Sequence, residues 1–187
     1  MRRFISYLSV LTLVAGAGAA LAFGPDPKSP SADEEWSPTA QEAFEQMKEL
    51  VGVWETTIDD KGSIARETFE VIAGGTTLVQ RTEFLNDPSH TMLTMYHVHD
   101  DELVLKHYCV AGNQPEMKAT KFAQNPRRIT FTYSGATGMA DRNEGHMDRA
   151  FFTFVDDDHF RDKWDWYEDG EVTWAHEFTY TRVEPQN

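Results

Sequence analysis

The fold is decided by residues 146–183, which are HMDRAFFTFVDDDHFRDKWDWYEDGEVTWAHEFTYTRV. Aromatic and β-branched residues fill three segments, 146–155, 159–167 and 171–183, and short acidic or glycine-containing breaks separate them. Aromatic and β-branched residues favour strands, and breaks of this length favour hairpin turns. The stretch therefore predicts three consecutive antiparallel strands.

The same pattern extends back to Gly52. Seven further runs are bounded by turn residues, at 53–59, 64–73, 76–85, 91–99, 102–110, 117–123 and 128–134. The short connections, among them the Gly74-Gly75 pair typical of a two-residue hairpin, leave no room for the crossovers that parallel strands need. The sequence predicts a mainly β protein with a single antiparallel up-and-down barrel of about ten strands over 51–183, because closure removes exposed edges. A two-sheet sandwich is the alternative.

The first residues have the composition of a secretory signal peptide. Arg2 and Arg3 precede an apolar run that ends in Ala20-Leu21-Ala22. A short basic region, a hydrophobic stretch and small residues before the cut define such a signal. We expect residues 1–22 to be cleaved, which leaves no membrane span and makes the protein periplasmic or secreted; a retained membrane anchor is the alternative.

A flexible linker and one helix precede the barrel. Residues 23–37 are rich in Pro, Ser, Asp and Glu, which favours a flexible segment. Ser37-Pro38 provides an N-cap followed by proline at the first helical position. Phe44, Met47 and Val51 then recur at helical spacing, which predicts an amphipathic helix over 38–50.

Composition limits the partners. The chain has 187 residues, of which 17 are basic and 31 acidic, giving a formal net charge of −14. Nucleic acids and anionic membrane surfaces select basic patches, so neither is expected as a partner. Cys109 is the only cysteine, which excludes an internal disulfide, and we expect its thiol to be buried.

The burial of one sheet face predicts the register of the last hairpin. A three-residue loop Glu168-Asp169-Gly170 pairs Trp164 with Trp174 and Asp162 with His176. It places the large apolar groups of both strands on one face. A similar turn at 156–158 brings the preceding strand, with its His146 and Phe152, beside that face.

The hairpin around Asp100-Asp101 extends the same face to two earlier strands. It pairs Tyr96 with Leu105, Thr94 with His107, and Met92 with Cys109. A ten-stranded barrel is wider than its side chains fill, so we expect a cavity inside.

Apolar walls with a few convergent polar groups are typical of a small-molecule pocket. We expect nine residues to bind an apolar or amphipathic ligand: Tyr96, His107, His146, Phe152, Asp162, Trp164, Trp174, His176 and Phe178. Among them Tyr96, His107 and His176 orient the polar head, and four aromatic rings hold the body: Phe152, Trp164, Trp174 and Phe178. Asp148 and Arg81 are further polar candidates for the interior.

Other interpretations of the interior polar groups stay open. Asp162 and His176 can form a structural pair that fixes register, or they can join His146 and Asp148 in a metal or catalytic site. No nucleophile elbow, phosphate loop or dinucleotide fingerprint occurs in the sequence, so no motif supports enzyme activity. On the outer face, Leu93, Met95 and Tyr108 are candidates for a homodimer patch or for the docking of the helix.

Two motifs suggest a family. Gly52-Val53-Trp54 resembles the Gly-x-Trp start of lipocalin-like, calycin-type barrels. Tyr96-His97 and the run HYCVAGNQPEM at 107–117 resemble a family of exported bacterial barrels of unknown function. The resemblance implies a lipocalin-like barrel without an established reaction. A more distant similarity to nitrobindin-like barrels implies haem as the cofactor, with His176 as the iron ligand.

Overall fold

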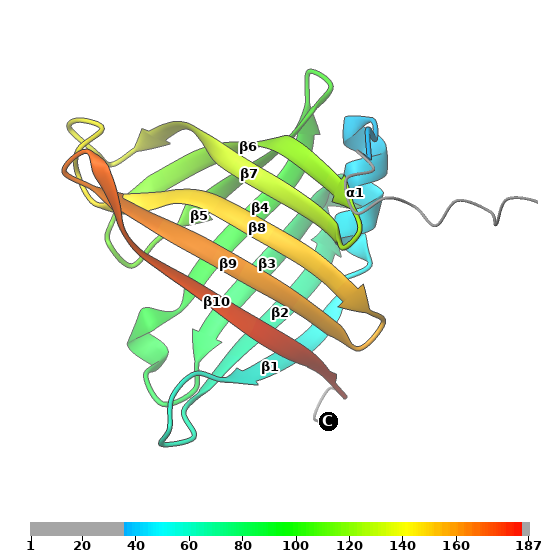
Figure 1. The fold of residues 1–187 in the computed structure, drawn as a ribbon, viewed down its shortest axis with the longest axis horizontal. Helices are drawn as coiled ribbons and strands as arrows, with labels where there is room; N and C mark the ends of the chain where they lie inside the picture. The colour runs from blue at the N-terminus through cyan, green and yellow to red at the C-terminus, as the bar shows by residue number, and fades with distance from the viewer. Residues whose placement is uncertain (1–35, 185–187) are drawn as a thin grey trace, which may run out of the picture.

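The computed structural model describes residues 36–184, so the predicted signal peptide and nearly all of the predicted linker lie outside the described residues. Within this part the chain forms ten strands in the spatial order β1-β10-β9-β8-β7-β6-β5-β4-β3-β2. All neighbouring strands are antiparallel and the sheet closes on itself (Figure 1). The predicted up-and-down barrel is confirmed, and the chain does not form the two-sheet sandwich.

The strands lie close to their predicted positions. They are β1 (Gly52–Thr57), β2 (Ile64–Ile72), β3 (Thr77–Phe84), β4 (Met92–His99), β5 (Glu102–Tyr108), β6 (Gln114–Gln124), β7 (Arg127–Thr137), β8 (His146–Asp156), β9 (His159–Glu168) and β10 (Glu171–Val183). The predicted two-residue hairpin at Gly74-Gly75 is wrong. Ile72 and Thr77 form the last pair of this hairpin, and a 3-10 turn, η1 (Ala73–Gly75), occupies most of the connection between them.

The helix α1 (Ala40–Lys48) begins later than predicted. Thr39, not Ser37, is its N-cap: the Thr39 hydroxyl accepts from the Glu42 N–H at 3.2 Å, and the Glu42 carboxylate accepts from the Thr39 N–H at 2.8 Å. Phe44 and Met47 are buried in the main core, whereas Val51, beyond the helix, is exposed. The helix contacts β4 and β5 and lies at one end of the barrel (Figure 1).

Side chains fill the barrel at the α1 end. Trp54 is 1 % exposed, and its Nε1 donates to the Leu50 carbonyl at 2.7 Å. The Arg182 guanidinium lies 3.9 Å from the Trp54 ring and donates to the Val51 carbonyl at 2.8 Å. Gly52 has φ +134°, and a Cβ there would approach Arg182 Nη1 to 2.7 Å. The positive φ therefore favours glycine at this position, and the missing Cβ leaves room for the Arg182 guanidinium over Trp54.

The β4–β5 hairpin has its predicted register, whereas the β9–β10 hairpin does not. In β4–β5 the pairs Tyr96–Leu105 and Thr94–His107 are confirmed. In β9–β10 the prediction is wrong by two residues, because His176 lies opposite Trp164 and Phe178 lies opposite Asp162.

A β-bulge explains the wrong register. The hairpin pairs Glu168 with Glu171 across a two-residue turn, and the register shifts between Val172 and Trp174. The extra residue returns Trp174 to the face of Trp164. Asp162 and His176 are therefore not cross-strand partners.

Cys109 and Arg81 do not lie inside the barrel as predicted. Cys109 lies beyond the end of β5, in a turn that is closed by its own N–H donating to the Asn113 carbonyl at 3.1 Å. Its side chain is half-buried, and it does not pair with Met92 across the β4–β5 hairpin. Arg81 is exposed on the outer face, 3.2 Å from the Glu83 carboxylate. Among residues 36–184, no helix has the length and apolar character needed to cross a membrane.

The outer-face patch is only partly exposed. Tyr108 is 42 % exposed, whereas Leu93 and Met95 are half-buried. These residues lie on β4 and β5, the two strands that α1 contacts. The homodimer remains a prediction.

Candidate ligand cavity inside the barrel

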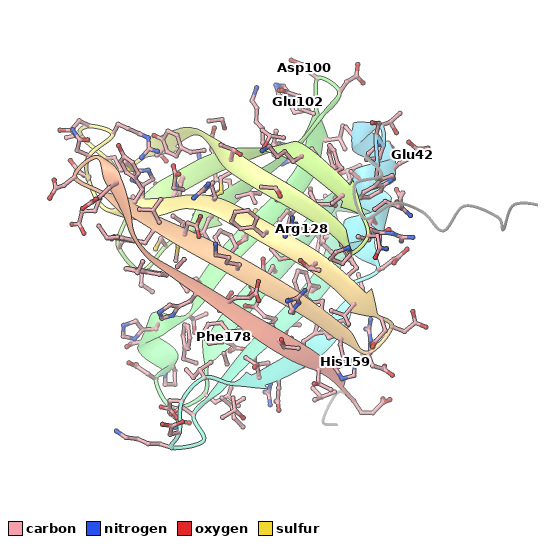
Figure 2. The ribbon with its side chains drawn as sticks, viewed as in Figure 1. Glu42, Asp100, Glu102, Arg128, His159 and Phe178 are labelled. Carbon is pink, nitrogen blue, oxygen red and sulfur yellow. The ribbon has the colours of Figure 1, made fainter. Side chains whose placement is uncertain are left out.

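The half of the barrel away from α1 contains a cavity of about 280 Å³. Its walls come from the middle of β2 and β9, the ends of β3 and β5, the starts of β4 and β8, residues 174–180 of β10 and the loop after β1. Figure 2 marks Phe178 midway along β10, and His159 at the β8–β9 turn near the α1 end. The lining residues are Ile58, Glu67, Thr82, Phe84, Met92, His107, Met147, Asp162, Trp164, Trp174, His176, Phe178 and Tyr180.

The structure brings six of the nine predicted ligand residues to this cavity: His107, Asp162, Trp164, Trp174, His176 and Phe178. Tyr96 and Phe152 are fully buried in the packed core and do not line it. Their rings pack edge-on at 5.8 Å, and the Phe152 ring lies 6.1 Å from Trp164. His146 lies outside the lining, in the separate cluster described below.

The rim of the cavity carries exposed aromatic side chains. Trp174 is 38 % exposed and stacks on Trp166 with ring centres 5.7 Å apart. His176 is also exposed, and its ring lies 4.8 Å from that of Trp174. Ile58, half-buried in the β1–β2 connection, lines the cavity as well. A ligand entering from this end would first meet apolar and aromatic surface.

Glu67 is a cavity residue that sequence reasoning missed. It is 2 % exposed, and its carboxylate accepts from Gln80 Nε2 at 2.9 Å, Thr82 Oγ1 at 3.0 Å and the Tyr180 hydroxyl at 3.4 Å. The sequence does contain a signal for it, because Glu67 lies two residues from both Ala65 and Phe69 and therefore shares their buried face of β2. Three donors from two other strands fix this carboxylate at the cavity.

Tyr96 acts on the cavity through Gln80. Its hydroxyl donates to Gln80 Oε1, and Gln80 in turn donates to Glu67. Because the amide oxygen and nitrogen each have a partner, the orientation of the Gln80 side chain is fixed. Tyr96 is therefore a positioning residue for the Glu67 carboxylate.

Asp162 is the second buried acid of the cavity. It is 2 % exposed; Oδ2 accepts from Trp164 Nε1 at 3.1 Å, whereas Oδ1 has no hydrogen-bond partner in the described part of the chain. Burial raises the pKa of Asp162 to about 7. Burial and the nearby charge of Asp162 raise the pKa of Glu67 well above its ordinary value. Near neutral pH the two carboxyl groups therefore carry less than two full negative charges.

His107 provides the third polar group. It is 3 % exposed, with Nδ1 2.8 Å from Thr94 Oγ1, and its ring lies 5.0 Å from Trp164. Nε2 has no partner among residues 36–184. Burial lowers the pKa of His107 to about 4, so the ring is neutral at pH 7. Depending on the tautomer that Thr94 selects, Nε2 faces a ligand as donor or acceptor.

His146 belongs instead to a cluster around Arg142. The guanidinium lies between the rings of Tyr133 and Tyr167, at 4.2 and 3.8 Å. It donates to Asp148 Oδ1 and to His146 Nε2, and His146 Nδ1 donates to the Glu144 carbonyl at 2.5 Å. This cluster supplies its own cation and needs no ligand.

The four residues proposed as a metal or catalytic set are thus divided between two places. Asp162 and His176 line the cavity, whereas His146 and Asp148 contact Arg142. In the part of the chain that the structure describes, no three metal-ligating side chains come together. Haem does not fit the cavity either: about 280 Å³ is too small for a haem group, and the buried acids of the cavity oppose the haem propionates.

A larger depression of about 690 Å³ lies on the surface near the C-terminal end of α1. Its cations already have partners: Arg182 donates to the carbonyls of Glu49 and Asp157 at 3.1 and 2.9 Å, and Arg127 donates to Gln46. The interior cavity, which keeps buried polar atoms without partners, is therefore the stronger candidate site.

No protein-family model and no curated protein matches this chain. A crystal structure of a DUF3598-family protein of unknown function from Nostoc punctiforme aligns with 84 % of this chain at 14 % identity and a TM-score of 0.43. The chain spans about half the length of that protein, 53 % of which is covered.

Proposed function

We propose that this protein is an exported binding barrel for a small apolar or amphipathic molecule, held inside the barrel between β2, β9 and β10. One observation carries the proposal: aromatic walls enclose a cavity in which two nearly buried polar atoms, Asp162 Oδ1 and His107 Nε2, have no partner in residues 36–184. Such atoms are costly to bury unless a ligand or water satisfies them.

The assignment to lipocalin-like barrels is part of this proposal. It is supported by the Gly52-Val53-Trp54 start, where Trp54 is buried beneath Arg182 at the filled end of the barrel. One filled end and one end with a cavity suit a protein that receives a ligand from a single side. The predicted signal peptide supports a role outside the cytoplasm.

The binding test uses a neutral apolar fluorophore, N-phenyl-1-naphthylamine, added to the full chain. We expect its emission to rise on binding, and Trp174→Ala to weaken binding about tenfold, because the Trp174 side chain lines the cavity. Trp36→Ala is the matched control, since Trp36 packs on Phe122 away from the cavity. Absence of binding, or equal losses in both variants, would contradict the proposal.

Acid–base catalysis on the bound molecule is the second candidate. It is favoured by one observation: Asp162, with a pKa of about 7, shares the cavity with a neutral imidazole, His107. A general acid or base works best when its pKa lies near the working pH. Mass spectrometry of the molecule recovered after incubation distinguishes the two, because a carrier returns it unchanged.

A further inference from the structure

Among the residues that the structure describes, those lining the cavity include two buried acids and no lysine or arginine. Neither Glu67 nor Asp162 forms an ion pair within residues 36–184, and no described lysine or arginine lines the cavity. Elsewhere this chain pairs its buried acids. Asp165, 1 % exposed, lies 2.7 Å from the Arg149 guanidinium and 3.1 Å from the Lys163 ammonium. The cavity thus lacks the positive charge that its acids would require when ionised.

We infer that the ligand carries a protonated amine, which binds at the carboxylates of Asp162 and Glu67 while its apolar body lies among the aromatic rings. The inference rests on the proposed function, because it names the ligand class of the same cavity. The free Asp162 Oδ1 is the primary acceptor for the ammonium group. Glu67, held by Gln80, Thr82 and Tyr180, is the second charge.

The aromatic walls suit a cation as well as an apolar body. Trp164 lines the cavity, and its Nε1 donates a hydrogen bond to Asp162. Phe178 lies directly opposite Asp162 on the neighbouring strand. An ammonium next to the carboxylates would therefore also lie beside π faces, which attract cations most when water is excluded. A carboxylate ligand would meet the opposite conditions, since it would bring a third acid to the same site.

The groups that face Asp162 decide how binding depends on pH. Glu67 comes from β2 and Tyr180 from β10. Each is either neutral or negatively charged, so neither provides a positive charge for Asp162. His107 from β5 is neutral at pH 7, and His176 lies at the exposed rim. On the outer side, Glu177 raises the pKa of Asp162 further.

An ammonium group therefore has to displace a proton from the acid pair. Because the pKa of Asp162 is about 7, amine binding should strengthen between pH 6 and pH 8 and should release a proton. A neutral head group bound to the protonated carboxyl should show the reverse dependence.

The test compares three probes of matched size: 2-phenylethylamine, 2-phenylethanol and phenylacetate. Isothermal titration of the full chain at pH 6.5, where Asp162 is mostly protonated, and at pH 7.5, in two buffers of different ionisation enthalpy, measures affinity and proton release together. We expect the amine to bind about 10- to 100-fold more tightly than the alcohol, the range that one charged hydrogen bond gives.

The variant Asp162→Asn should bring the amine down to the affinity of the alcohol. Glu70→Gln is the matched control, because Glu70 is an exposed acid on the outer face of the strand that carries Glu67. Thermal melts of both variants verify folding. Proton release is measured on the unmodified chain, so this part of the test holds even if a variant fails to fold.

Equal or tighter binding of the alcohol or of phenylacetate would overturn the inference. So would amine binding without proton release, or a lack of amine binding to a chain that still binds N-phenyl-1-naphthylamine. In each of these cases the proposed binding function stands. If the neutral fluorophore fails to bind as well, the proposed function itself fails.

Discussion

Asp148 and Asp162 are both poorly exposed acids beside aromatic rings, yet their surroundings are opposite. Asp148 receives a guanidinium from Arg142, which two tyrosine rings cover. Asp162 receives one indole N–H, and its other oxygen has no partner in the described residues. The first cluster is complete without a ligand, and the second is not.

The difference separates stability from function. A partly buried ion pair such as Arg142–Asp148 holds a loop in place, and removing either member leaves the other charge without its partner. An unpaired buried acid has the opposite effect, because it lowers the stability of the folded chain whenever it is ionised. A chain tolerates such a group where a ligand completes it, and it then gains stability on binding.

The largest effect we expect is on the pH dependence of unfolding. The folded pKa of Asp162, about 7, exceeds its ordinary value of 3.8, so the folded state holds this proton more tightly than the unfolded state. The Asp162 carboxyl therefore makes its full contribution to the free energy of unfolding below about pH 4, and this contribution is lost as the pH rises through 7. The shift of its pKa corresponds to a loss of roughly 4 kcal/mol.

Asp162→Asn should remove that loss. In urea unfolding the variant should match the unmodified chain near pH 4 and be more stable at pH 8, with Glu70→Gln as the control for an exposed acid. A variant that is less stable at pH 8 would mean that the ionised carboxylate has a favourable partner, and the contrast with Asp148 would disappear.

Arg142→Met should act in the other direction. The substitution keeps an apolar chain between Tyr133 and Tyr167 but leaves Asp148 and His146 without their donor. Because the Arg142 side chain is 37 % exposed and Asp148 12 %, we expect a loss of about 2 kcal/mol, less than for a fully buried pair.

Urea unfolding at pH 7.5 measures this loss, and fluorophore binding in the cavity should stay unchanged. Arg161→Met is the matched control: Arg161 pairs with Glu177 at 3.3 Å on the surface, where the expected cost is under about 0.5 kcal/mol. Equal losses in the two variants would show that the Arg142 cluster is an ordinary surface pair.

Much of the fold follows from the sequence because strands alternate. Short turns and aromatic runs predict ten sequential strands, and burial of one face predicts which residues point inward. The β4–β5 register was predicted correctly because its acidic turn has no irregularity. The β9–β10 register was not, because a bulge after Val172 moves every later pair while leaving the inward residues on the same face.

The candidate site was harder to predict than the fold. Alternation along β2 pointed Glu67 inward, but a lone acid between Ala65 and Phe69 gives no hint of the three donors that hold it. His146 was placed with the cavity because its strand faces inward. Its actual partner, Arg142, comes from the β7–β8 loop, and no periodicity predicts how a loop folds over a barrel end.

The smallest effect we expect is that of His176→Ala. If Asp162 and His176 formed a structural pair, this substitution would leave a buried acid alone and cost a few kcal/mol. In the observed register His176 is exposed and lies opposite Trp164, so the expected loss in urea unfolding is under about 0.5 kcal/mol. Phe178→Ala, which removes the ring opposite Asp162, should cost about 2 kcal/mol. Should the histidine variant prove as unstable as the phenylalanine variant, Asp162 would have a partner after all, and the cavity would have no free acid to offer a ligand.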